Sequence, residues 1–286
     1  MVLQEETKII RDKDTKKINA LFTEQNNCMQ ILSKNKLKYI RSLKTSKFRQ
    51  KYNNFVVEGF KSIHEFLQTN TFEIECLVMT KEMANGFTSK TYNNLNLDFI
   101  EIGTDEDFVM ISNLTTPSKM LAVFGRSTIN CEQILTNSDV VFYLDDVQDP
   151  GNVGTIIRIA DWFGIKGVIR SKNAADFYSP KVVQASMGSF NKVKLATIGD
   201  IKEITAFGHQ ILALDMDGDN INNFQFPSKS ILVLGNEGNG VGEELLHMCS
   251  KRISIPGSMD RIAESLNVAI TAGIVAQKFF YLKTKN

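Results

Sequence analysis

Residues 139–158, DVVFYLDDVQDPGNVGTIIR, decide the fold of the C-terminal half of this chain. The segment from Val140 to Val147 (VVFYLDDV) is predicted to be a strand that ends in carboxylates, and its apolar run is typical of strands that are buried on both faces of a parallel sheet. A Pro-Gly-Asn loop follows it, and Thr155–Gly164 then has the apolar spacing of a helix that ends at a glycine. This order of strand, loop and helix predicts a doubly wound α/β sheet.

Two later segments repeat the same design, at residues 232–242 (LVLGNEGNGVG) and 253–268 (ISIPGSMDRIAESLNV). Because ligands of such sheets bind beyond the carboxyl ends of the strands, we expect the three loops to converge on one site. The intervening pattern predicts strands at 166–170, 192–197 and 210–215, and helices at 179–188, 201–208, 243–249 and about 262–282.

The N-terminal half has shorter alternating elements. Strands are predicted at 55–59, 75–80, 97–102 and 120–125, with a helix at 61–69, which indicates a small α/β domain over residues 31–130. Residues 131–138 are interpreted as a linker, and residues 139–286 as the second domain. The polar residues 1–30 are expected to form an extension, and we hypothesise that translation naturally starts at Met29.

A basic segment opens the small domain. The segment from residue 34 to residue 61 contains nine Lys and Arg residues but only one acidic residue, Glu58, although the whole chain has a net charge of only +1. Tyr39, Phe48 and Tyr52 lie among these cations, which favours RNA binding, while a solvated helix face is the alternative. The residues expected to contact RNA are Lys36, Lys38, Arg41, Lys44, Lys47 and Arg49.

Several classes of protein are disfavoured by missing patterns. The four cysteines form no CxxC pair and the three histidines lack metal-ligand spacing, so no metal site is expected. No P-loop, GxSxG elbow or GxGxxG after the first strand is present. Without a signal peptide or a long apolar run, we expect a cytoplasmic protein that does not enter membranes.

Taken together, DDVQDPGNVGTIIRIADWFG, LVLGNEGNGV and ISIP followed by ESLNVAI resemble the three motifs of the SpoU/TrmH-type RNA ribose 2′-O-methyltransferases, in the SPOUT superfamily. The resemblance covers roughly residues 139–286. The small domain is similar to the ribosomal-protein-like RNA-binding domain that often precedes this catalytic domain. Between Pro256 and Ser265 the chain carries about two more residues than the family pattern.

The resemblance implies a trefoil knot that holds S-adenosyl-L-methionine. Leu234, Gly235, Ile255 and Leu266 would offer it backbone groups and apolar walls. It also implies a homodimer that packs near the knot, where the final helix carries small residues such as Ala272 and Gly273; core packing is the alternative for these residues.

The implied reaction is methyl transfer to a ribose 2′-hydroxyl, in ribosomal RNA or alternatively in tRNA. The family's base matches Arg158, but a guanidinium stays protonated, so we expect Arg158 to bind the adjacent phosphate and lower the pKa of the hydroxyl. Asn152, Glu237, Ser265 and Asn267 are the other candidate catalytic residues, with helix capping as the structural alternative. A non-catalytic RNA-binding protein of this fold is the remaining hypothesis.

Overall fold

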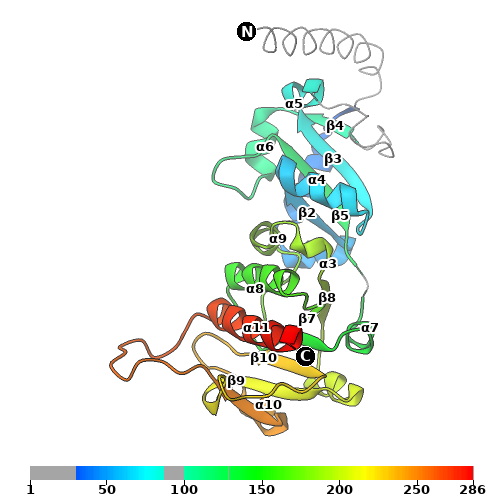
Figure 1. Ribbon diagram of the computed structural model, residues 1–286. Coiled ribbons are helices and arrows are strands. Elements are labelled where there is room, and N and C mark those ends of the chain that lie inside the picture. The colour runs from blue at the N-terminus through cyan, green and yellow to red at the C-terminus, as the bar shows by residue number, and fades with distance from the viewer. Residues whose placement is uncertain (1–29, 87–99, 128, 286) are drawn as a thin grey trace, which may run out of the picture. The chain divides into compact units, whose positions relative to one another are not determined.

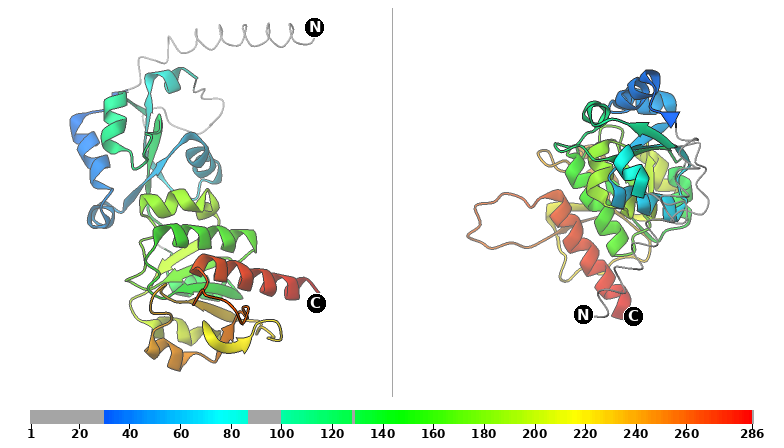
Figure 2. Two further views of the ribbon diagram at one scale, coloured as in Figure 1. Left: turned by 90° about the vertical axis from the view of Figure 1, so that its left-hand side faces the viewer. Right: turned by 90° about the horizontal axis from the view of Figure 1, so that it is seen from above.

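The computed structural model describes residues 30–86, 100–127 and 129–285 (Figures 1 and 2). The chain divides into two compact units, with the boundary between Arg126 and Ser127. The expected N-terminal extension and Met29 lie outside the described residues.

The first unit is built on a mixed five-stranded sheet of order β1-β4-β3-β5-β2. β5 runs antiparallel to β2 and β3, whereas β1, β4 and β3 are parallel. Its elements are β1 (Gln30–Ile31), α2 (Lys34–Ser42), α3 (Ser46–Tyr52), β2 (Asn54–Glu58), α4 (Phe60–Thr69), β3 (Ile74–Thr80), α5 (Lys81–Gly86), β4 (Ile100–Gly103), α6 (Asp105–Ile111) and β5 (Met120–Gly125).

Apolar side chains fix helices to both faces of this sheet. Ile40 and Leu43, at α2, and Phe108 of α6 belong to a buried cluster with strand residues such as Val78. Phe66 of α4 packs instead against an aromatic group formed by Phe55, Phe72 and Phe124. The alternation of apolar residues along β2 and β5 therefore gives two cores, one on each face.

The second unit has a six-stranded, fully parallel sheet of order β11-β9-β10-β6-β7-β8. This confirms the predicted parallel α/β architecture. Its elements are α7 (Cys131–Thr136), β6 (Val140–Leu144), α8 (Pro150–Trp162), β7 (Gly167–Arg170), α9 (Pro180–Ser186), the 3-10 helices η3 (Ser189–Asn191) and η4 (Ile201–Phe207), β8 (Lys194–Thr197), β9 (Gln210–Asn220), β10 (Ser230–Leu234), α10 (Glu243–Met248), β11 (Lys251–Ser254) and α11 (Val268–Lys285).

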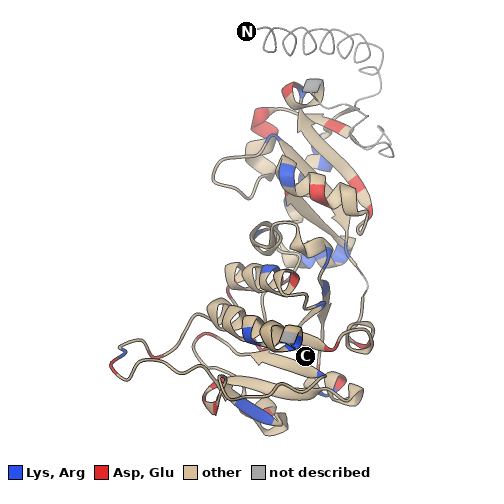
Figure 3. Ribbon diagram, viewed as in Figure 1, with Lys and Arg blue, Asp and Glu red and all other residues tan. Residues whose placement is uncertain are grey.

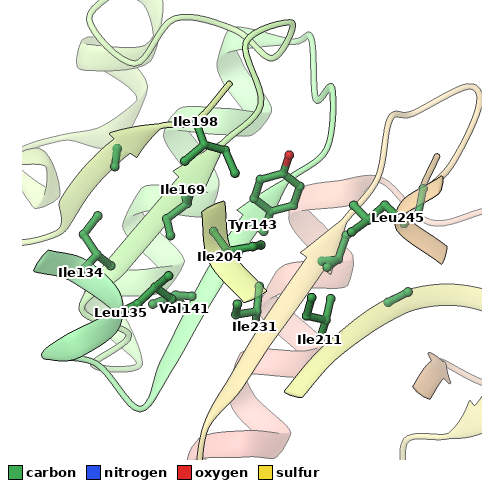
Figure 4. Close-up of a cluster of buried hydrophobic side chains, with 14 residues drawn as sticks. Ile134, Leu135, Val141, Tyr143, Ile169, Ile198, Ile204, Ile211, Ile231 and Leu245 are labelled. Carbon is green, nitrogen blue, oxygen red and sulfur yellow. The ribbon is translucent and has the colours of Figure 1, made fainter. Parts of the chain in front are cut away.

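Helices cover both faces of this sheet, as in doubly wound folds. α8 packs against α9 and α11 on one face (Figure 1). On the other face, side chains from α7, η4 and α10, including Ile134, Ile204 and Leu245, form one buried cluster with Val141 and Ile231 of the central strands (Figure 4).

Two sequence interpretations are wrong in this unit. Residues 131–136 form helix α7 instead of a linker, because Asn130 and Gln133 make a capping box and Ile134 and Leu135 are buried in the sheet core. The last helix begins at Val268 instead of near residue 262. Within the described ranges, no helix combines the length and apolar character needed to cross a membrane.

Candidate active site

A chain of side-chain hydrogen bonds connects the three loops that follow β6, β10 and β11. Asn152 donates from Nδ2 to Oε1 of Glu237 at 2.8 Å, and Asn267 donates from Nδ2 to Oδ1 of Asn152 at 3.0 Å. Oδ1 of Asn267 also accepts from the backbone N–H groups of Ala269 and Ile270 at the start of α11. The structure thus brings together three of the five predicted catalytic residues.

The position of Asn152 is set by the start of α8. Asp149 is the N-cap residue and Pro150 follows it, so the helix begins earlier than the sequence pattern predicted and Asn152 lies in its first turn. Oδ1 of Asp149 accepts from the backbone N–H of Asn152 at 2.9 Å, and Lys181 pairs with its other oxygen at 3.2 Å. The Asn152 hydrogen bond and the Lys181 charge lower the pKa of the Asp149 carboxyl.

Asn236 joins the loops after β6 and β10, a role that the sequence interpretation missed. Its Nδ2 donates to the backbone carbonyl of Asp146 at 2.9 Å, and its Oδ1 accepts from the N–H groups of Gly238 and Asn239. Asp146 has a positive φ of 54° and exchanges hydrogen bonds with Ser171. The pattern Asn-Glu-Gly-Asn-Gly at residues 236–240 is a sequence signal for a turn that an Asn side chain stabilises.

Asp145 fixes the other end of the β10 loop. Its Oδ2 accepts from the backbone N–H of Gly242 at 2.8 Å, and its own N–H donates to the carbonyl of Leu234. Burial raises the pKa of the Asp145 carboxyl, and the Gly242 hydrogen bond opposes this rise. These two contacts of Asp145 therefore order the loop that follows β10.

Of the residues expected to hold S-adenosyl-L-methionine, Leu234, Gly235 and Ile255 lie at the ends of β10 and β11, and Leu266 lies in the loop that follows β11. Leu234 is buried, and a Cβ on Gly235 would lie 2.3 Å from the backbone carbon of Gly240, so only glycine fits there. Leu266 is 50% exposed in the loop that follows β11, in which every residue from 256 to 267 is exposed. Backbone groups beside apolar side chains are what a neutral adenine requires, so the residues present fit the adenine part of this cofactor.

Arg158 is not part of the hydrogen-bonded chain in this unit. It lies six residues after Asn152 in α8, about 120° away around the helix axis, and its side chain is exposed. The nearby carboxylate of Asp161, three residues later in α8, accepts from Ser189 at 2.8 Å and pairs with Lys192. Within the described ranges, the side chain of Arg158 has no hydrogen-bond or ion-pair partner, and neither has the exposed side chain of Ser265.

The predicted RNA-contacting side chains divide into three groups. The prediction that Arg49 contacts RNA is wrong, because its side chain is only 3% exposed and its guanidinium donates to the carbonyls of Leu43 and Lys44. Lys36 pairs with Glu75 at 3.1 Å, and Lys44 donates to the Ser112 carbonyl. Lys38, Arg41 and Lys47 are exposed and remain expected RNA contacts. Figure 3 marks the Lys and Arg positions of the chain in blue.

Both units resemble domains of known RNA-modifying proteins. Residues 139–277 match the model of the SpoU rRNA Methylase family, and residues 34–122 match an MRM3-like substrate binding domain. The chain is 29% identical to the 23S rRNA (guanosine(2553)-2′-O)-methyltransferase RlmP of Bacillus subtilis, over 84% of this chain and 94% of the relative.

Two solved structures extend the likeness over both units. A TrmH-family protein from Porphyromonas gingivalis is 34% identical, with a TM-score of 0.76 over 87% of this chain and 98% of that one. An AdoMet-bound rRNA methyltransferase from Sinorhizobium meliloti is 26% identical, with a TM-score of 0.75 over 87% and 95% of the two chains. On this evidence, the chain belongs to the SpoU/TrmH family of RNA 2′-O-methyltransferases.

Proposed function

We propose that this protein methylates a ribose 2′-hydroxyl of ribosomal RNA with S-adenosyl-L-methionine. The observation that carries the proposal is the hydrogen-bonded chain of Glu237, Asn152 and Asn267, which joins all three family motifs. The rRNA substrates named for the relatives from Bacillus subtilis and Sinorhizobium meliloti favour ribosomal RNA over tRNA.

The bound cofactor supplies an electrophilic methyl group, and the side chains of the site prepare the hydroxyl that receives it. Asn152 and Asn267 have fixed amide groups at the start of α8 and α11, where they orient the target nucleotide together with Ser265. Glu237 holds Asn152 in place through the 2.8 Å hydrogen bond. Leu234, Gly235, Ile255 and Leu266 line the cofactor position.

Arg158 is the residue proposed to activate the nucleophile, which is the ribose 2′-hydroxyl. Its protonated guanidinium has two parallel N–H groups that suit the phosphate beside the target ribose. A positive charge at that place favours the developing alkoxide and lowers the pKa of the 2′-hydroxyl. The exposed position of Arg158, without an ion-pair partner among the described residues, leaves this charge available for RNA.

The proposed assembly is a homodimer that forms through α8 and α11, in the cytoplasm. Ile270, Ile274 and Tyr281 follow helical spacing along α11 and remain 56%, 36% and 44% exposed. Trp162 of the adjacent α8 is 82% exposed and lies one turn after Arg158. Exposed apolar residues gathered on two packed helices are typical of a protein interface, and a partner placed there would lie next to Arg158.

Calorimetric titration of S-adenosyl-L-methionine, followed by methyl transfer to rRNA and tRNA transcripts, tests the function. We expect saturable binding by the native protein and loss of binding in Gly235→Ala, because the added Cβ displaces the Gly240 backbone. Gly238→Ala is the matched control in the same loop, since its Cβ meets only the Asn236 oxygen at 3.6 Å. Failure of the native dimer to bind the cofactor, with or without RNA, would overturn the proposal.

A further inference from the structure

The basic segment of the first unit holds an ordered set of aromatic rings. In α3, the rings of Phe48 and Tyr52 are nearly parallel, with an interplanar angle of 14° and centroids 6.2 Å apart. Tyr39 of α2 meets Tyr52 edge to face at 5.0 Å. Tyr52 keeps 40% of its surface exposed although two aromatic rings lie beside it.

A polar network in the sheet anchors these rings. The hydroxyl of Tyr39 donates to Glu75 at 2.6 Å and accepts from Nδ2 of Asn54 at 2.6 Å. Glu75 also pairs with Lys36, so the group on β2, β3 and α2 is satisfied internally. Tyr39 is thereby held in one orientation, and Tyr52 is held against it.

Arg49 fixes the angle between the two basic helices. Its buried guanidinium donates at 2.9 and 2.8 Å to the carbonyls of Leu43 and Lys44, where α2 ends and the turn to α3 begins. A pre-formed platform loses less conformational entropy when it binds a ligand than a mobile one does. The buried Arg49 guanidinium thus stabilises the turn between α2 and α3, the two helices that form this surface.

Exposed cations lie on the same two helices as Tyr39 and Tyr52. Lys38, Arg41, Lys47 and Lys51 are all exposed on α2 and α3, and the Lys51 ammonium lies 5.2 Å from the centre of the Tyr52 ring. An exposed ring among uncompensated cations suits a nucleic acid strand, whose phosphates meet the lysines while a base stacks on the ring. A duplex would hide its bases from the ring, so the complementary ligand is unpaired RNA.

We propose that Tyr52 is the stacking platform for one unpaired base of the RNA, and that Lys38, Arg41, Lys47 and Lys51 contact the flanking phosphates. The identity of the ligand as RNA rests on the proposed function. All residues of this site belong to the first unit, whereas the residues of the proposed methyl-transfer site belong to the second. It gives the substrate domain a preference for single-stranded segments.

The test compares two fluorescent RNA probes with the full-length protein: a short oligoadenylate, and an oligomer of equal length whose central nucleotides lack bases. For Tyr52→Ala we expect a loss of roughly 5- to 150-fold in affinity for oligoadenylate, the range for one stacked base. The same variant should bind the abasic probe like the native protein, and Tyr52→Phe should bind both normally. Lys51→Gln should reduce the salt slope of log K by about 0.7.

Phe60 and Lys61 offer a matched control pair. Phe60 is 48% exposed, stacks on His64, and is followed by an exposed lysine, but it lies on α4, away from the basic helices. Phe60→Ala and Lys61→Gln should leave both probes unaffected. Equal weakening of the two probes by Tyr52→Ala, or no weakening at all, overturns the stacking site even when methyl transfer is intact. Loss of methyl transfer with the probe selectivity preserved would instead overturn only the proposed function.

Discussion

The side-chain amide of Asn267 donates to Oδ1 of Asn152 at 3.0 Å, joining the start of α11 to the start of α8 across 115 residues of sequence. Asn152 uses its other amide atom on Glu237, so both of its polar atoms are engaged. An amide is the group that accepts from Asn267 and donates to a carboxylate at the same time. The identity of residue 152 is therefore dictated by its two neighbours.

Asn152→Asp should lower kcat about 10- to 100-fold at neutral pH. The new carboxylate loses the donor to Glu237 and faces it as a like charge, which raises the pKa of the pair. As the pH falls, a shared proton restores the hydrogen bond, so the deficit should shrink in a pH–kcat profile. Asn137→Asp, at the end of α7, is the control; an equal deficit at every pH would contradict the expectation.

Arg158→Lys should retain folding and cofactor binding but lose roughly 10²- to 10³-fold in kcat, the scale for one stabilising donor. Lysine keeps the charge but lacks the planar fork that holds a phosphate. The alkaline limb of the pH–kcat profile should also move to higher pH. Arg252→Lys, which affects an exposed ion pair with Asp215, is the matched control. An unchanged limb would exclude action of Arg158 on the acidity of the hydroxyl.

Asp145→Asn and Asp149→Asn should affect stability with opposite signs. Burial raises the pKa of the Asp145 carboxyl in the folded state. The contribution of Asp145 to the free energy of unfolding is therefore most favourable at a pH below 3.8, the pKa in the unfolded chain, and it declines as the pH rises through the folded pKa. Asparagine keeps the oxygen for Gly242 without the desolvated charge. Urea midpoints of Asp145→Asn should therefore equal or exceed those of the native protein at neutral pH, and the advantage should vanish in acid.

Asp149 has a lowered pKa, so its charge stabilises the fold above 3.8 and that stabilisation is lost as the pH falls through the folded pKa. Asparagine is an equally good helix N-cap, which isolates the charge. Asp149→Asn should lower the urea midpoint at neutral pH and approach the native value in acid. Parallel curves for the two variants would contradict both assignments.

Trp162→Glu should convert the proposed homodimer into monomers and reduce methyl transfer strongly. A carboxylate at the centre of an apolar interface is desolvated without a partner. Light scattering coupled to size exclusion measures the mass, and calorimetry tests whether the cofactor still binds. Met216→Glu, on β9, places the same charge at another exposed apolar residue, which is 63% exposed in the chain, and should remain dimeric. A monomeric native protein would refute the assembly.

β6 and β10 were predictable because each is an apolar run that is followed by a carboxylate or a glycine. β7 and β10 lie within one residue of their predicted positions, whereas β6 ends at Leu144 and not at Val147 as predicted. Residues 131–138 were not predictable in the same way. Their single turn-and-a-half of helix is stabilised by burial of Ile134 and Leu135 against strands that follow later in the sequence.

By itself, the sequence determined the family, the parallel α/β architecture and the three loops, because local apolar patterns and motif spacing are properties of short segments. The trefoil knot stays a prediction. Only the tertiary structure decided that Asn152, Glu237 and Asn267 meet, that Arg49 is buried and that Arg158 is exposed. Contacts between residues far apart in sequence depend on how the elements pack, and a one-dimensional charge or hydropathy pattern carries no record of that packing.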